Sequence, residues 1–486
     1  MNLQEYANYD GLGLAELVKT GQVTPKELVD LALEGIDKVN PQLNGVWQIL
    51  KEQAYKEIES GLPEGDFQGV PFLIKEILLH AKDVTTNFGS RFAEGVSFPV
   101  DSFLMESFRK AGFVTIGTTS TPEWGYNATT EGVLHGPTHN PWGLGHSPGG
   151  SSGGAAASVA AGIVPIAHGN DGGGSIRIPA ANSGVIGLKP TRGRVSAGPF
   201  NSEPLAGNGI EFALTKTIRD TAALLDAVSI ERPGEYCYAP RPAVPFKEGI
   251  ETPVGKLRIS YSTKTALNHE PTDEVVAALN KTVELLRSLG HEVVEDYPEY
   301  DGEEFLAAVN DIWAASVAGM IEAVAAMKGE EPTEDVIEAA IWECYLEGKN
   351  MSALRYKAAI EVQAKVSRQV GEFFTKYGVA LSPTMGSEPV KHGVLDANNP
   401  NISALQLTHQ MLGKVAPYTA LYNATGQPAL SLPLHLSNNN LPIGMQFAGR
   451  YGDETTLLQL GKQLEEAAPW IDRKPAIHVS PSNVTV

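Results

Sequence analysis

Cysteines and basic residues are scarce in this chain of 486 residues. Its two cysteines, Cys237 and Cys344, form neither a metal-ligand spacing nor a disulfide framework, so we expect a reducing cytoplasm as its location. Lys and Arg number 37 against 57 Asp and Glu, which leaves a net charge of −20. A negative field repels phosphate backbones, so we expect no nucleic-acid partner.

Long apolar runs are missing as well. The first eleven residues, MNLQEYANYDG, lack the basic and apolar regions of a secretory signal. The longest run of small apolar residues, 155–163, is too short to cross a bilayer, so we expect no membrane partner. No internal repeat is present. The apolar fraction of 42% suffices for a large core, and we expect one domain over residues 1–486.

Glycine, in contrast, is abundant, and two glycine-rich runs each lead into a serine. In the stretch HGNDGGGSIRIP (168–179), Gly172, Gly173 and Gly174 lead into Ser175. Without Cβ atoms, such a turn brings backbone N–H groups around one small volume. A serine at its end has the setting of a nucleophile beside donors for an oxyanion. The alternative is a plain glycine turn whose serine caps a helix.

A second glycine run and a lysine accompany this loop. The run SPGGSSGG (147–154) places Ser151 24 residues before Ser175, and Lys75 closes the apolar segment GVPFLIK. Taken alone, a lysine after a buried strand is most often a rim residue that extends to water.

These segments together resemble the amidase signature family over about residues 13–470. The most specific text lies between Asn140 and Arg194: NPWGLG, SPGGSSGGAAASVAAG, DGGGSIRIPA and GLKPTRGRVS. The resemblance implies an α/β fold, a single large α/β/α sandwich in which helices cover a central, mixed, mostly parallel twisted sheet. It also implies covering helices in residues 1–60 and a helical insertion at 300–376 that forms a wall of the substrate pocket.

The same resemblance assigns roles to individual residues. Ser175 is the expected nucleophile, Ser151 the bridging serine after a cis peptide bond, and Lys75 a base kept neutral by burial, which lowers a lysine pKa. The backbone at Gly172, Gly173 and Gly174 is the expected oxyanion hole. Supporting roles fall to Asp171, Arg177 and Ser152, and candidate substrate contacts are Trp124, Tyr126, Asn127 and Trp313. No metal or organic cofactor is expected.

Two positions depart from the usual text of the family. Asn170 stands where Thr is usual, and Gly172 adds a third glycine. Both adjoin the expected oxyanion loop, so its donor geometry stays open. For the helical insertion, Trp342 and Cys344 face either the pocket or the core.

The glycine runs allow two other interpretations. Residues 149–153 match G-x-S-x-G, the nucleophile elbow of α/β-hydrolases, but His409, His435 and His478 have no recognisable setting for a triad. A phosphate cradle would need GK[ST] after the loop, which is absent from both runs.

We therefore expect an amidase that cleaves non-peptide amides, linear or cyclic, through an acyl-serine. The segments HGND, SIRIPA, KPTRGRVSAGP and PIGMQ look most like a subgroup that opens cyclic amide dimers. The alternatives are an aliphatic or aryl amidase, an esterase or carbamate hydrolase, an amidotransferase subunit acting on glutamine and charged tRNA, and a non-enzymatic scaffold. The expected partner is a small amide, and the chain is expected to be a monomer or homodimer.

Hydrophobic periodicity predicts the surrounding elements. Residues 13–40 should form two helices, 214–228 another, and 303–376 mostly helix. The order strand (256–261), helix (272–289), strand (291–295) predicts a parallel pair with a right-handed crossover.

Overall fold

One sheet of eleven strands runs through the protein. A computed structural model describes residues 1–265 and 267–480. In spatial order the strands are β1 (Val46–Ile49), β3 (Val114–Thr119), β2 (Pro71–Lys75), β4 (Ile166–Asp171), β6 (Ile210–Thr215), β5 (Ile186–Lys189), β10 (Ala429–Leu436), β11 (Pro442–Gly449), β9 (Val379–Pro383), β7 (Arg258–Tyr261) and β8 (Glu292–Glu295).

The sheet is mixed, as expected, but parallel pairs do not dominate it. Within the described residues, β2 pairs parallel to β3 and β4, and β7 pairs parallel to β8 and β9. The other six neighbouring pairs are antiparallel. The expectation of a mostly parallel sheet is therefore wrong. One physical reason is chain length: β10 and β11 are joined by five residues, a connection that only antiparallel strands can make.

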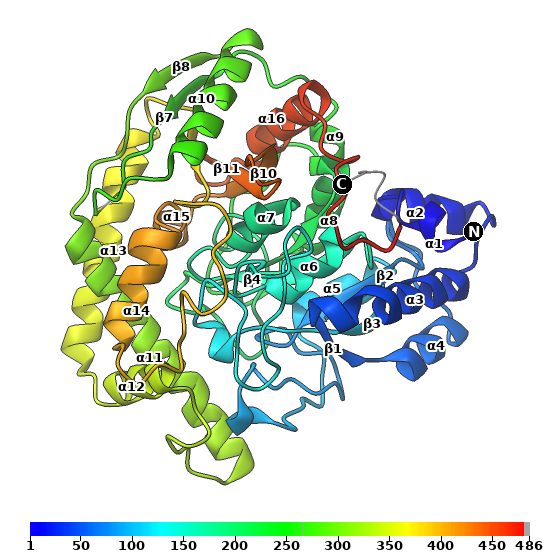
Figure 1. Cartoon of the computed structure of the whole chain (residues 1–486), viewed down its shortest axis with the longest axis horizontal. Coiled ribbons are helices and arrows are strands. Elements are labelled where there is room, and N and C mark those ends of the chain that lie inside the picture. Colours follow the sequence, from blue (N-terminus) through cyan, green and yellow to red (C-terminus); the bar gives the residue numbers. More distant parts are fainter. Residues whose placement is uncertain (266, 481–486) are drawn as a thin grey trace.

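Helices cover the sheet and the sides of the molecule (Figure 1). Those up to residue 249 are α1 (Leu3–Tyr6), α2 (Gly11–Lys19), α3 (Pro25–Leu43), α4 (Lys51–Glu59), α5 (Phe103–Lys110), α6 (Gly153–Ala160), α7 (Arg177–Ser183), α8 (Ile218–Val228) and α9 (Phe246–Gly249). Those after it are α10 (Asp273–Ser288), α11 (Gly302–Lys328), α12 (Ala339–Lys349), α13 (Ala353–Phe373), α14 (Ala404–Gln410), α15 (Ala420–Thr425) and α16 (Glu454–Ala467).

The N-terminal helices form where the sequence signals them. Thr24 caps α3 in a capping box with Glu27, Pro25 occupies the first turn, and the apolar face that follows is buried. The helix contacts β2 and β3 near one end of the sheet. Helices α11, α12 and α13 lie on the opposite side of the molecule (Figure 1).

Helix α11 is long and apolar enough to cross a membrane by length and composition alone. However, 61% of its most apolar window is buried inside this structure. Its buried residues, among them Ile312 and Val317, belong to an apolar core shared with α12, α13 and α14. The helix therefore has the burial of a core helix.

The centre of the sheet carries elements that the hydrophobic pattern did not reveal. The segment 214–228, expected as one helix, instead ends β6 at Thr215 and starts α8 at Ile218. Strands β4, β5 and β6 are buried on both faces, so their residues lack the alternation that marks a half-buried strand. By contrast, β7 and β8 pair in parallel around α10, as predicted.

Candidate active site

Lys75, Ser151 and Ser175 meet above the central strands. Lys75 is the last residue of β2, Ser151 lies in the loop before α6, and Ser175 lies in the loop between β4 and α7. Every residue of α6 is buried, and the helix contacts β2, β4 and α7. Small side chains on all its faces permit this close packing, which brings the two serine loops together.

The Lys75 amine is enclosed by three oxygen atoms. Its Nζ lies 2.7 Å from Ser151 Oγ, 3.0 Å from Ser152 Oγ and 2.6 Å from Asn170 Oδ1. The side chain has no solvent exposure, so these contacts are made away from water. The lysine is therefore not a rim residue.

The partners of these oxygens define which way each hydrogen bond runs. Asn170 Oδ1 only accepts, because its amide donates to Ile77 O at 2.9 Å. Ser152 donates its hydroxyl to Asn170 O at 3.2 Å, so its oxygen also accepts from Lys75. A neutral amine has two hydrogens and one lone pair. With both hydrogens used by Asn170 and Ser152, its lone pair faces Ser151 Oγ.

Burial favours this neutral form. It lowers the pKa of Lys75 to about 7, although the negative charges of Glu211, Asp171 and Glu76 oppose the shift. Near neutral pH a substantial fraction of Lys75 is therefore a free amine. This is the protonation range in which a general base works best.

The two serines are linked through the backbone. The peptide bond between Gly150 and Ser151 is cis, as the sequence analysis predicted, and Ser152 N–H donates to Ser175 O at 3.2 Å. Within the described residues no hydrogen bond joins Ser175 Oγ to Ser151 Oγ. Ser175 is 7% exposed, so its hydroxyl can meet a small ligand. Catalytic hydrogen bonds are often formed only when substrate is present.

The glycine loop is held by one buried ion pair. Asp171 Oδ1 and Oδ2 accept from Arg177 Nη2 and Nε, each at 2.9 Å, and both side chains are fully buried. Burial raises the pKa of Asp171, but the charge and hydrogen bonds of Arg177 outweigh it and bring the pKa to about 2. The remaining N–H groups of Arg177 bond to Thr419 O, Gln446 Oε1 and Asn423 Oδ1.

This ion pair changes the predicted oxyanion hole. Gly174 N–H donates to Asp171 Oδ1 at 2.7 Å, so it is not free for a ligand, and the prediction for Gly174 as a donor is corrected. Gly174 instead has a conformational role, because its φ of +135° favours glycine. The amides of Gly172, Gly173 and Ser175 make no hydrogen bond within residues 1–265 and 267–480. These three are available donors.

The two residues that depart from the usual family sequence, Asn170 and Gly172, lie in different parts of the site. Asn170 faces the Lys75 amine rather than the oxyanion loop. At Gly172, an added Cβ would lie 2.9 Å from Trp313 Cζ2 and would also collide with Leu205. The third glycine therefore leaves space for the Trp313 ring.

A small cavity opens beside Ser175. The space in it, counting the part that is open to solvent, is about 370 Å³. Three of the predicted contacts line it, namely Tyr126, Asn127 and Trp313. Gly173 and Ser175, which were predicted for the oxyanion hole and as the nucleophile, line it as well. Sequence reasoning missed the others, which are Gly125, Ala128, Ile178, Thr408, Met411 and Leu412. Met411 and Leu412 belong to a π-helical turn, Met411–Val415, that continues α14, a feature that is common at functional sites.

Three aromatic or sulfur side chains are not part of this wall. Trp124 was a predicted contact, but it does not line the cavity; it is 1% exposed and packs against Phe88 in the apolar core. Cys344 is also buried in the core, and Trp342 packs against Tyr345. Residue spacing alone gave no signal to separate these from Trp313.

The histidines needed for a nucleophile elbow lie elsewhere. His435 bonds to Thr282, and His478 bonds to Ser480. In the part of the chain that the structure describes, neither these nor His409 is hydrogen-bonded to Ser151 or Ser175. Ser151 contacts a lysine instead, which fits the bridging role and not that of an elbow nucleophile.

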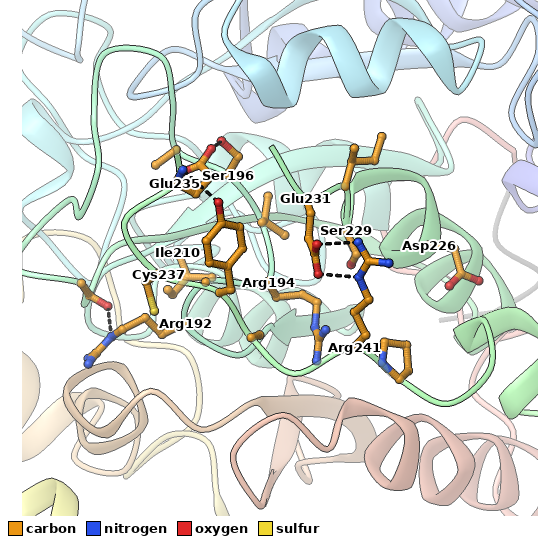
Figure 2. A pocket seen from close by; sticks show the side chains of 18 of the residues that line it. Arg192, Arg194, Ser196, Ile210, Asp226, Ser229, Glu231, Glu235, Cys237 and Arg241 are labelled. Carbon is orange, nitrogen blue, oxygen red and sulfur yellow. Dashed lines mark hydrogen bonds and ion pairs between the residues drawn. The ribbon is translucent and has the colours of Figure 1, made fainter. Parts of the chain in front are cut away.

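A larger cavity lies on the surface, and the space in it, counting the part that is open to solvent, is about 1580 Å³ (Figure 2). Residues from three segments line it, namely 192–197, 202–210 and 226–246. Arg241 is paired with Glu231, and Ser196 with Glu235 (Figure 2). Arg194 is paired with Glu454. No lysine or histidine is among its lining residues, so no serine there has the kind of base that Ser151 has in Lys75. The chemistry therefore favours the smaller cavity at Ser175 as the active site.

Comparisons with known proteins show what the whole chain is similar to. Residues 27–458 match the family model described as Amidase. The chain is 37% identical over 481 residues to 6-aminohexanoate-cyclic-dimer hydrolase of Paenarthrobacter ureafaciens, covering 96% of each protein. A solved structure of 6-aminohexanoate cyclic dimer hydrolase superimposes with a TM-score of 0.92 at 35% identity, over 97% of this chain and 99% of that one. The structure of that hydrolase complexed with substrate gives a TM-score of 0.91 at 34% identity and the same coverage.

Proposed function

This chain belongs to the Amidase family and is an amidohydrolase, and from that premise we propose that Ser175, Ser151 and Lys75 cleave the amide through an acyl-serine. The observation that carries the assignment is the hydrogen-bond set of Lys75 Nζ. It leaves the lone pair of a neutral amine directed at Ser151 Oγ, 2.7 Å away. Ser151 is then the only catalytic group through which a proton from Ser175 reaches the base.

In the acylation step, Ser175 Oγ attacks the carbonyl carbon of the substrate amide. The Ser175 proton passes to Ser151 Oγ while the Ser151 proton passes to Lys75 Nζ. Collapse of the tetrahedral intermediate breaks the carbon–nitrogen bond, and the leaving nitrogen takes a proton back through Ser151. A water molecule then attacks the acyl-serine, with its proton following the same path, and releases the acid.

The negative oxygen of the intermediate needs donors that are already in place. The amides of Gly172, Gly173 and Ser175 fit this role, because Asp171 holds the loop while using only the amide of Gly174 among the glycines. Loss of one such donor typically slows a reaction about 10²–10³-fold.

The cavity favours a neutral, largely aliphatic acyl group. Its lining includes Ile178, Trp313, Met411 and Leu412, and none of its lining residues is a carboxylate or a basic side chain. An unpaired charge would lose its hydration there. A cyclic dimer of 6-aminohexanoate has two amides and no charged end, whereas the linear dimer has an ammonium and a carboxylate. We therefore propose a cyclic dimer of this type as substrate.

One polar group in the wall is free to orient such a ring. Trp313 Nε1–H is buried and has no hydrogen-bond partner within the described residues. The second carbonyl of a cyclic diamide is an acceptor for this N–H group.

We also propose that the enzyme works in the cytoplasm, in keeping with its two free cysteines. We propose further that it is a monomer or homodimer.

The test is labelling with a fluorophosphonate, followed by peptide mapping by mass spectrometry. The expected label lies on Ser175 and is lost in Ser175→Ala and strongly reduced in Lys75→Ala. Ser158→Ala is the matched control, because Ser158 is buried on α6 but bonds only to Gly154 O. A label on Ser151, or equal labelling of Lys75→Ala and wild type, would contradict the assignment.

The substrate proposal has its own measurement. Release of primary amine from the cyclic dimer and disappearance of the linear dimer are followed side by side. The cyclic dimer should have the higher kcat/KM. A linear dimer cleaved equally well would contradict the substrate proposal and leave the assignment of the three residues intact.

A further inference from the structure

A buried histidine and a buried glutamate lie behind the catalytic lysine and take no part in the steps above. His168 on β4 and Glu211 on β6 are diagonal neighbours across the antiparallel pairing of these strands, with His168 Nε2 2.6 Å from Glu211 Oε2. On its other side, His168 Nδ1 accepts the backbone N–H of Lys75 at 3.2 Å. All three side chains are buried.

The contact with Lys75 replaces a strand hydrogen bond. β2 and β4 pair in register only at Leu73 and Ala167, so the ladder does not extend to Lys75. The imidazole supplies the acceptor for the Lys75 N–H in place of a β4 carbonyl. The end of β2, which carries the base, is thereby attached to β4, which carries Asn170.

The contact with the Lys75 backbone also determines which ring nitrogen of His168 carries the proton. Because Nδ1 accepts from a backbone N–H, the ring proton must be on Nε2, and Nε2–H donates to Glu211. His168 thus accepts from the Lys75 backbone on one side and donates to the Glu211 carboxyl group on the other. Within residues 1–265 and 267–480 Glu211 forms no ion pair with a lysine or arginine, so its charge is not cancelled by a cation.

We propose that His168 and Glu211 are positioning residues for the general base: His168 anchors the Lys75 backbone, and the Glu211 charge sets how readily the Lys75 amine accepts a proton. The inference rests on the proposed role of Lys75. Without an opposing charge, a fully buried lysine would be a weaker base towards the Ser151 proton. The carboxylate restores part of that basicity.

The charges around Lys75 agree with this arrangement. Burial lowers its pKa to about 7, and the opposing influences are, in order, Glu211, Asp171 and Glu76. Asp171 is neutralised by Arg177, and Glu76 lies 2.8 Å from His135. Glu211 is thus the carboxylate with the largest influence, and within the described residues its side chain is hydrogen-bonded to His168 alone.

The test compares wild type with Glu211→Gln and His168→Asn. The glutamine keeps an oxygen to accept from His168 Nε2–H but removes the charge. The asparagine keeps an oxygen for the Lys75 N–H but leaves Glu211 without its donor, which favours the protonated carboxyl. Both changes should lower the pKa of Lys75. The measured quantity is the rate of fluorophosphonate labelling of Ser175 against pH.

The acid limb of that profile should move to lower pH by about half a unit or more in both variants, with a lower maximal rate because the base is weaker. Glu465→Gln is the control, since Glu465 is a partly buried carboxyl on α16 that bonds to Ile218 N and does not face Lys75. Its acid limb should coincide with that of wild type.

The outcomes separate this inference from the proposed function. If the variants lose thermal stability or rate at every pH while the acid limb stays where it is in wild type, the pair is only structural and the inference is overturned. If wild type carries no label on Ser175, the proposed function fails first.

Discussion

Asn170 Oδ1 lies 2.6 Å from Lys75 Nζ, closer than either serine oxygen that contacts the amine. The amide of the same side chain is fixed by Ile77 O. A residue that departs from the usual family text therefore orients the base. Its replacement of threonine adds length, which lets the side chain reach both the amine and the backbone after β2.

Shortening Asn170 should misdirect the lone pair of Lys75. We expect Asn170→Ala to lower kcat about 10-fold, the effect of losing one hydrogen bond of about 1–2 kcal/mol to a reacting group. Asn170→Thr should retain more activity than Asn170→Ala, because a hydroxyl can still accept from Nζ. Steady-state kinetics with unchanged KM would support the role. Equal kcat for wild type and Asn170→Ala would contradict it.

Activity should depend on pH through Lys75. The neutral amine is the active form and its pKa is about 7, so kcat/KM should fall about tenfold per unit below pH 7 and level off above it. Protonation inactivates, hence the loss is on the acid side. A rate profile from pH 5 to 9, with stability checked at each pH by circular dichroism, measures this. A profile that is flat down to pH 5 would exclude Lys75 as the base.

Breaking the ion pair between Asp171 and Arg177 under the glycine loop should destabilise the fold. Asp171→Asn leaves the fully buried Arg177 without its counter-charge, and we expect about 3–5 kcal/mol of destabilisation. The native pKa of Asp171 is below that of an unfolded aspartate, so this stability is present above about pH 4 and is lost as pH falls towards 2. Denaturant unfolding measures both effects. Glu361→Gln, in an exposed pair with Lys357, is the control and should leave the midpoint unchanged.

Two neighbouring glycines should respond differently to alanine. At Gly174 the φ of +135° is unfavourable for alanine, and a Cβ would collide with Thr419 and lie 2.7 Å from Ile178 Cδ1. At Gly173 the nearest atom to a Cβ is Leu412 Cδ2 at 3.6 Å, an ordinary contact. Gly174→Ala should therefore lower Tm by several degrees, and Gly173→Ala should not. Equal Tm values for the two variants would show that the loop adapts.

Trp313 offers a test of how the ring of the substrate is held. Trp313→Phe keeps the aromatic wall but removes the Nε1–H that has no partner in the described chain. KM for the cyclic dimer should rise several-fold, while the rate of fluorophosphonate labelling of Ser175 should not change. An unchanged KM would mean that this donor does not contact the substrate.

Sequence reasoning found the chemistry because the chemistry is local. Ser151 and Ser175 are each enclosed by small residues in a short stretch, and Lys75 ends an apolar strand. The same locality explains why α3 and α10 were predicted, since caps and helical spacing are properties of neighbours in the chain. The cis bond before Ser151 came from the family resemblance and not from any spacing.

The wall of the cavity was largely missed for the opposite reason. Thr408, Met411 and Leu412 reach Ser175 only through tertiary packing, more than 230 residues later in the chain. Trp124 and Trp313 are both apolar aromatics near expected elements, and only the fold distinguishes the core residue from the lining residue. Strand β6 was not predicted, because a strand that is buried on both faces shows no alternation. Glu211 lies on this strand and was missed for the same reason.

The cavity and the reacting groups are encoded in different parts of the chain. Lys75, Ser151 and Ser175 sit on β2 and on the loops beside α6 and α7, whereas the π-helical turn at Met411–Val415 and Trp313 on α11 supply much of the wall. Mutations in the wall can therefore change which amide fits without disturbing the bonds made by Lys75. Such a division lets a lineage acquire a new substrate through a few substitutions at the wall while the hydrolytic step is inherited unchanged.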